Sequence, residues 1–152
     1  MIMKSVFLLL LLHLAGPSFL HGQHTVPDEK QRKDIYSLID KYSEAREKRD
    51  TILLKSILMA EVDQLVSTGE WRNGMNASVK GMLKSSSSSP GTRTLNIEKI
   101  RLLNPTSAIV DCNYEIKNTD GTIRKMWSTF IAVSDKGVWK ISAIRNMLPT
   151  GQ

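Results

Sequence analysis

The chain has 152 residues, which is enough for one compact domain and leaves little room for a second. Its 21 Lys and Arg against 15 Asp and Glu give a formal charge of +6, and no run of like charge is typical of a nucleic-acid-binding tail. All three histidines (His13, His21 and His24) precede Pro27, and the single cysteine is Cys112. The rest of the chain therefore excludes histidine-based catalysis, histidine-bound zinc and an intrachain disulfide, and we expect neither a metal nor a cofactor.

The first 23 residues have the features of a secretory signal peptide. Lys4 precedes a short apolar run that ends at Gly16-Pro17. This run is shorter than a helix that spans a bilayer usually is. We interpret residues 1–23 as the signal peptide, 24–34 as a tail and helix start, and 35–149 as the folded domain. Cleavage would yield a secreted or periplasmic protein with no stable membrane span. An uncleaved membrane anchor is the alternative.

Apolar side chains at helical spacing predict helices in the first half of the chain. Pro27-Asp28 offers a cap for a first helix, whose apolar stripe is Ile35, Leu38, Ile39, Tyr42 and Ala45. Asp50 begins a second, shorter helix, and residues 62–66 are typical of a short strand. A third helix starts near Asn76, and the serines at 85–89 predict a flexible loop after it.

After Thr92 the apolar period changes to two, which predicts strands. The strands cover residues 95–103, 108–116, 123–134 and 138–147, and turn signals separate them at Asn104-Pro105, Asp120-Gly121 and Asp135-Lys136-Gly137. Helices followed by an antiparallel sheet indicate an α+β fold with the helices on one face of the sheet.

The turns predict which strand residues face each other. If Asp120-Gly121 is a two-residue hairpin loop, Tyr114 pairs with Trp127; if residues 135–137 form a three-residue loop, Trp127 pairs with Arg145. The more apolar face is then assigned to the core, with Val110, Cys112, Tyr114, Ile116, Trp127, Thr129, Ile131, Val133, Trp139, Ile141, Ala143 and Arg145. The other face is mixed in polarity and suits a homodimer interface, with candidates Asp111, Asn113, Met126, Phe130 and Ile144.

Short phrases at residues 62–66, 69–72, 93–98, 111–114, 124–127 and 139–146, in this order of elements, resemble the SnoaL-like branch of the nuclear transport factor 2-like superfamily. The resemblance implies a cone-shaped, curved antiparallel sheet wrapped around two to three N-terminal helices. It also implies a pocket at the open end and frequent dimerisation through the outer face of the sheet. Many SnoaL-like domains carry histidine where this chain has Arg145, so a role that depends on that imidazole is not carried over.

Arg145 is the most informative candidate residue. The predicted register places it on the apolar face beside Trp127, and a buried arginine requires an anionic partner or a ligand. Asp63 is the natural partner, because the resembling fold puts its strand next to the last one. Arg145 is then either half of an internal ion pair or a ligand-binding group. The complete predicted pocket comprises Trp71, which is either a lid over the pocket or a core plug, together with Tyr114, Trp127, Thr129 and Arg145.

Three residues are candidates for catalysis: Asp63, Glu98 and Tyr114. Asp63 could act as a general base if a ligand separates it from Arg145. Glu98 falls on the core face, in the row of Tyr114, if five residues connect Leu103 to Ile109, and is otherwise a surface residue of an edge strand. Arg145 or Tyr114 would stabilise an oxyanion.

Three functions remain open. The first is an exported SnoaL-like domain that binds a small, partly apolar and anionic ligand. The second is a histidine-free isomerase, cyclase or hydrolase with a pocket carboxylate as general base. The third is a non-catalytic module for dimerisation or partner binding. A cavity of a few hundred cubic ångströms, roughly, would favour the first two functions over the third.

Overall fold

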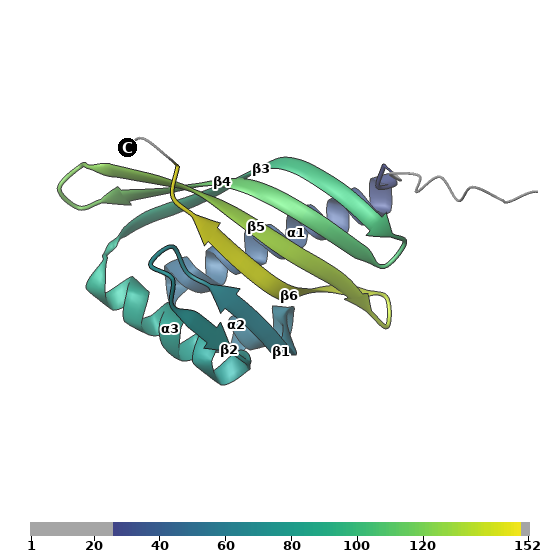
Figure 1. The fold of residues 1–152 in the computed structure, drawn as a ribbon, viewed down its shortest axis with the longest axis horizontal. Helices are drawn as coiled ribbons and strands as arrows, with labels where there is room; N and C mark the ends of the chain where they lie inside the picture. Colours follow the sequence, from purple (N-terminus) through teal and green to yellow (C-terminus); the bar gives the residue numbers. More distant parts are fainter. Residues whose placement is uncertain (1–25, 150–152) are drawn as a thin grey trace, which may run out of the picture.

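The computed structural model describes residues 26–149, in which helices come first and most of a six-stranded sheet follows (Figure 1). The helices are α1 (Glu29–Lys48), α2 (Thr51–Ile57) and α3 (Met75–Ser88). The strands are β1 (Leu58–Leu65), β2 (Trp71–Asn73), β3 (Gly91–Asn104), β4 (Ser107–Asn118), β5 (Ile123–Asp135) and β6 (Val138–Met147). The predicted α+β class is confirmed. The expected signal peptide lies outside the described residues.

The strands follow the order β2-β1-β6-β5-β4-β3, and the helices cover one face of the sheet (Figure 1). Neighbouring strands are antiparallel except β1 and β6, which are parallel, so the sheet is mixed where a purely antiparallel one was expected. Because β1 pairs with β6, the strand that follows α2 lies beside the last strand of the sheet in chain order. Within residues 26–149, each helix is too short or too polar to cross a bilayer.

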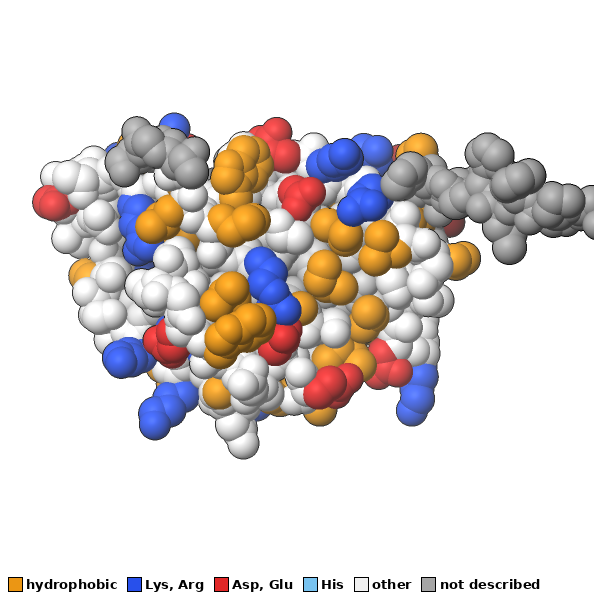
Figure 2. Space-filling model, in the orientation of Figure 1, with side chains coloured by type: hydrophobic (Ala, Val, Ile, Leu, Met, Phe, Trp, Pro, Cys, Tyr) orange, Lys and Arg blue, Asp and Glu red, His pale blue; other side chains and the backbone are white. Residues whose placement is uncertain are grey.

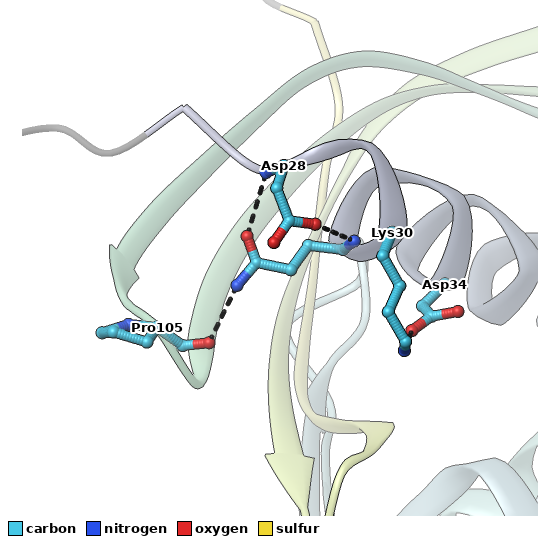
Figure 3. A network of polar contacts seen from close by, with 5 residues as sticks. Asp28, Lys30, Asp34 and Pro105 are labelled. Atoms are coloured by element: carbon cyan, nitrogen blue, oxygen red, sulfur yellow. Dashed lines mark hydrogen bonds and ion pairs between the residues drawn. The ribbon is translucent and has the colours of Figure 1, made fainter.

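Helix α1 forms as its sequence predicts. The Asp28 carboxylate accepts from the backbone N–H of Gln31, and the Gln31 side chain accepts from the N–H of Asp28, which is a reciprocal cap (Figure 3). The Gln31 amide also donates to the carbonyl of Pro105 and so ties the helix start to the β3–β4 turn. The predicted apolar stripe is buried throughout: Ile35, Leu38, Ile39, Tyr42 and Ala45.

The serine run differs from its prediction. Residues 85–88 form the last turn of α3 and not a flexible loop. The hydroxyls of Ser85 and Ser88 donate to the carbonyls of Met82 and Lys84, one turn back, which lets serine continue a helix that its propensity alone disfavours.

Both hairpin loops differ from their predictions by one residue. Asn118 and Thr122 bond across a three-residue loop, in which Gly121 has φ 85° and the Asp120 carboxylate accepts from the Thr122 N–H. The β5–β6 connection has two residues instead of three, and both Lys136 and Gly137 have positive φ (51° and 82°). The loop lengths are therefore the reverse of the prediction, with three residues in the β4–β5 loop and two in the β5–β6 loop.

The shift turns the side chains of β5 over, because facing alternates along a strand. Tyr114 pairs with Met126 and not with Trp127. Met126, Phe130 and Ile144 were predicted at a dimer interface, but they are buried at 4%, 0% and 2% exposure. Trp127, Thr129 and Arg145 were predicted in the core-facing pocket, but they lie on the opposite face of the sheet, which we call the outer face. On β6, the reversal of Ile144 and Arg145 follows from a bulge between Ile141 and Ala143, opposite Ile131 and Ala132. The predicted alternation of β4 is correct: its core side chains are Val110, Cys112, Tyr114 and Ile116.

Candidate anion-binding pocket

A cavity of about 210 Å³ opens where the end of α1 meets the end of α3 and the sheet. It is lined by residues of α1 and α3, of the β1–β2 turn, and of all six strands. Its charged lining consists of five cations and one carboxylate: Arg46, Arg72, Lys84, Arg93, Arg124 and Glu70. The pocket is therefore strongly electropositive.

Arg46 supplies a buried positive charge at the end of α1. Its side chain extends the apolar stripe by one turn beyond Tyr42, and the residue is only 7% exposed. One terminal nitrogen donates to the Tyr42 hydroxyl (3.2 Å) and the other to Ser85 Oγ (3.0 Å), while Nε has no partner. Burial acts to lower the pKa of Arg46, but the oxygens of Tyr42 and Tyr114 keep that pKa above its ordinary value. No described carboxylate forms an ion pair with this guanidinium.

Tyr114 and Arg93 also line the pocket, and each has one buried polar atom without a hydrogen-bond partner. Tyr114 is 4% exposed, and its hydroxyl has no hydrogen-bond partner. Burial raises the pKa of Tyr114 and the charges of Arg46 and Arg93 act against that rise, so the phenol stays protonated near neutral pH. Arg93 donates from its terminal nitrogens to carbonyls of Gly91, Ser85 and Ser89, which leaves its buried Nε without a partner.

Of the other three cations, two are exposed at the mouth of the cavity, and Arg72 is buried at 8% exposure. Arg124 and Lys84 are exposed, and Arg124 donates to Ser67 Oγ at 2.7 Å. Arg72 pairs with Glu70 at 3.1 Å. The single carboxylate of the lining is thus matched by one arginine, and the remaining cations have no acidic partner in the described part of the chain.

A larger hollow of about 380 Å³ lies between α1, α2 and the β5–β6 turn. Lys30 and Asp34, which line it, pair with each other at 2.6 Å (Figure 3). None of its lining residues has a buried polar atom without a partner. The smaller, cationic cavity is therefore the better candidate site.

The predicted pocket residue Arg145 lies on the outer face, away from this cavity. Its guanidinium makes two 3.0 Å hydrogen bonds to the Asp63 carboxylate and stacks over the Trp71 ring, 4.8 Å from its centroid. The ion pair with Asp63 is confirmed, whereas the row Tyr114, Trp127 and Arg145 is wrong. β1 and β6 pair in parallel here, which is what places Asp63 beside Arg145.

Glu98 is also on the outer side of the sheet. A bulge between Ile97 and Lys99 leaves it exposed, where it accepts from the Asn113 amide. Asp111 accepts from the Thr129 hydroxyl on the same face, as its predicted outward orientation requires. Neither proposed base, Asp63 or Glu98, lines the cavity with Tyr114, so the predicted catalytic group is not assembled.

Cys112 behaves as its position in the sequence predicts. Its side chain is fully buried, and burial followed by the negative charges of Asp111 and Glu98 raises the pKa of its thiol to about 12. The thiolate is therefore absent at neutral pH, and Cys112 packs as a small apolar group. Among residues 26–149, no cluster of His, Cys, Asp and Glu side chains could hold a metal ion.

Most residues of this pocket were missed by the sequence interpretation, and the most important of them are the cations Arg46 and Arg93. A signal for Arg46 existed, because it follows Tyr42 by four residues on the buried stripe of α1. Arg93 alternates with Leu95 and Ile97 on β3, whose side chains pack against the core. Extending each apolar pattern by one step would have found both residues.

Solved structures share this fold. A nuclear transport factor 2-like protein of unknown function from Shewanella oneidensis MR-1 is 19% identical, with a TM-score of 0.66 over 76% of this chain and 98% of that one. A cystatin-like protein of unknown function from Nostoc punctiforme is 10% identical, with a TM-score of 0.71 over 84% and 97%. An uncharacterised cystatin-like protein from Caulobacter vibrioides is 19% identical, with a TM-score of 0.68 over 80% and 92%. No family model and no curated protein matches the chain by sequence.

Proposed function

From this nuclear transport factor 2-like, cystatin-like fold and the charge of its cavity, we propose an exported domain that binds a small anionic ligand. The observation that carries the proposal is the buried guanidinium of Arg46, which has no carboxylate partner. Export rests on the signal-like residues 1–23. The SnoaL-like branch remains part of the proposal, as the sequence resemblance implies.

An uncompensated buried charge is costly, because burial removes hydration that no protein group replaces. At an effective dielectric constant of 20, an anion about 4 Å from a cation gains about 4 kcal/mol of Coulomb energy. The unused donors of Arg46, Arg93 and Tyr114 would then give that anion charge-assisted hydrogen bonds. The apolar Ile116 and Met126 in the lining suit a ligand that is partly apolar.

We expect Arg46→Met to abolish binding of butyrate while leaving the fold intact. Wild-type protein should bind butyrate about tenfold more tightly than the neutral butyramide, as an NMR titration at low salt would measure. The Arg46→Met variant should lose that preference, and its free energy of unfolding should stay unchanged or rise by about 1 kcal/mol, because a buried charge is replaced by an apolar side chain.

Lys33→Met is the matched control, because it removes an equal charge from an exposed position of α1 outside the cavity. It should retain the preference for butyrate. Equal affinity of the wild type for butyrate and butyramide would contradict the proposal.

A second candidate, homodimerisation, is favoured by the outer face of the sheet. Large apolar side chains are exposed there: Trp71 (52%), Trp127 (41%) and Met147 (48%). Figure 2 shows hydrophobic side chains gathered on this face around a few charged ones. Exposed apolar surface of this kind is typical of a surface that a partner covers, and we propose a second copy of the chain as that partner.

Trp127→Asp should dissociate this dimer, because each copy would then bury an unpaired charge. Sedimentation velocity at about 50 µM should show a dimer for the wild type and a folded monomer for the variant. Ile52→Asp, on the exposed side of α2, is the control and should remain dimeric. A monomeric wild type would contradict the proposal.

A further inference from the structure

The unpaired cations of the pocket fall into two groups at different depths. Arg46 is buried at 7% exposure, and the Nε of Arg93 is buried beside it. Lys84 and Arg124 are exposed at the mouth. Arg72 belongs to neither group, because Glu70 neutralises it. Two cations therefore remain unpaired at the base and two at the mouth.

The inner group can hold one acid group and no more. The terminal nitrogens of Arg93 already donate to carbonyls, and those of Arg46 to Tyr42 and Ser85. The free donors are one Nε on each arginine and the Tyr114 hydroxyl. Three donors match the oxygens of a single carboxylate or phosphate group.

The outer group can hold a second acid group. Arg124 is held at the rim by Ser67, and Lys84 projects from the last turns of α3. Ser67 and Ser89 line the same region, and their hydroxyl groups can donate to anionic oxygens. Arg124 and Lys84 have no acidic partner among the described residues, so a single acid group at the base would leave both of them unmatched.

Between the two groups the lining offers apolar contact. Ile116 and Met126 lie on neighbouring strands that extend from the base toward the β4–β5 hairpin. The cavity, at about 210 Å³, is smaller than the typical site of a drug-sized ligand. Tyr114 is the only aromatic side chain of the lining, so the described residues provide no platform for stacking a base.

We propose that the ligand is a short aliphatic dianion, with one acid group on Arg46, Arg93 and Tyr114 and the second on Arg124 and Lys84. A dicarboxylate is the simplest member of this class. This inference rests on the proposed function, because it presupposes that the pocket binds an anion at all. It adds that the site recognises its ligand by two negative charges and by the distance between them.

The test compares each dicarboxylate from malonate to adipate with its own monomethyl ester, by NMR titration or calorimetry at low salt. The ester keeps the shape of the ligand and removes one charge. At the best chain length, the wild type should bind the diacid about tenfold more tightly than the ester. Arg124→Met should reduce diacid affinity to the level of the ester while changing ester affinity by less than about twofold.

Arg46→Met should abolish binding of both compounds, and Lys33→Met should change neither. If the wild type binds every diacid and its ester equally, the inference is wrong and the proposed function survives. If the wild type binds neither compound at any chain length, the proposed function itself fails. If Arg124→Met weakens diacid and ester alike, the mouth does not hold a separate acid group and the inference is wrong.

Discussion

Phe130→Asp should prevent the domain from folding. The ring of Phe130 is fully buried and packs edge-on against Tyr42, with ring centroids 5.1 Å apart. Losing a buried phenylalanine side chain costs about 3–5 kcal/mol, and a buried carboxylate adds a further penalty of several kcal/mol, roughly. The sum is comparable to the whole stability of a small domain, which is about 5–15 kcal/mol. Circular dichroism and sedimentation should show an unfolded or aggregated variant.

Trp127→Asp is the matched control, because it places the same charge on the same strand but on the outer face. Trp127 is 41% exposed, so this variant should stay folded. The pair distinguishes the two possible registers of β5 directly. A folded Phe130→Asp variant beside an unfolded Trp127→Asp variant would support the register in which Trp127 faces the core.

Arg145→Met should lower the free energy of unfolding by about 1–2 kcal/mol. It removes two hydrogen bonds to Asp63 and the stacking on Trp71, and it leaves the carboxylate without its partner. The Arg145 and Asp63 side chains are 33% and 35% exposed, so water screens the pair and the cost is smaller than the loss of a fully buried one.

Asp63→Leu alone should cost a similar amount, and combining it with Arg145→Met should cost no more than either single change. The double variant removes both charges of the Arg145–Asp63 pair and places apolar side chains beside Trp71. Urea denaturation of all three variants measures the coupling, which we expect to be about 1 kcal/mol. Strictly additive costs would show that the two side chains do not stabilise each other.

Local patterns predicted α1 and β4 well, because each has one dominant apolar period. The stripe of α1 and the alternation of β4 are both buried as their spacing indicates. Such patterns decide which residues of one element share a face. They do not decide how two strands align, since alignment depends on the loop between them.

The loops misled the prediction because Asp-Gly suits more than one hairpin. Asp120 accepts from the N–H of Thr122, which draws Thr119 into the loop and makes it three residues long. In the next hairpin, Lys136 adopts a left-handed backbone that residues other than glycine rarely take. Each loop differs from its predicted length by one residue. On β5, this difference places the predicted pocket residues on the outer face and the predicted interface residues in the core.

The site was missed for a different reason. Arginine on a helix is normally solvated, and its burial at position 46 follows from the neighbours that Ser85, Tyr42 and Tyr114 provide in three dimensions. The apolar stripe of α1 places Arg46 on the buried face, and the alternation on β3 does the same for Arg93. Neither pattern contains the distant neighbours, such as Ser85, that let a guanidinium stay buried.

The hydrogen bond from Gln31 to Pro105 also bears on where the domain can be joined to a surface or to another protein. It anchors the start of α1 at the β3–β4 turn, while Arg46, at the other end of the helix, lines the pocket. At 1.5 Å per residue, about 25 Å of helix separates the two ends. Strand β6, by contrast, ends at Met147, directly after pocket-lining Asn146. A tether joined just before α1 therefore leaves the mouth open to solvent, whereas a fusion or sensor surface joined directly after β6 would crowd it.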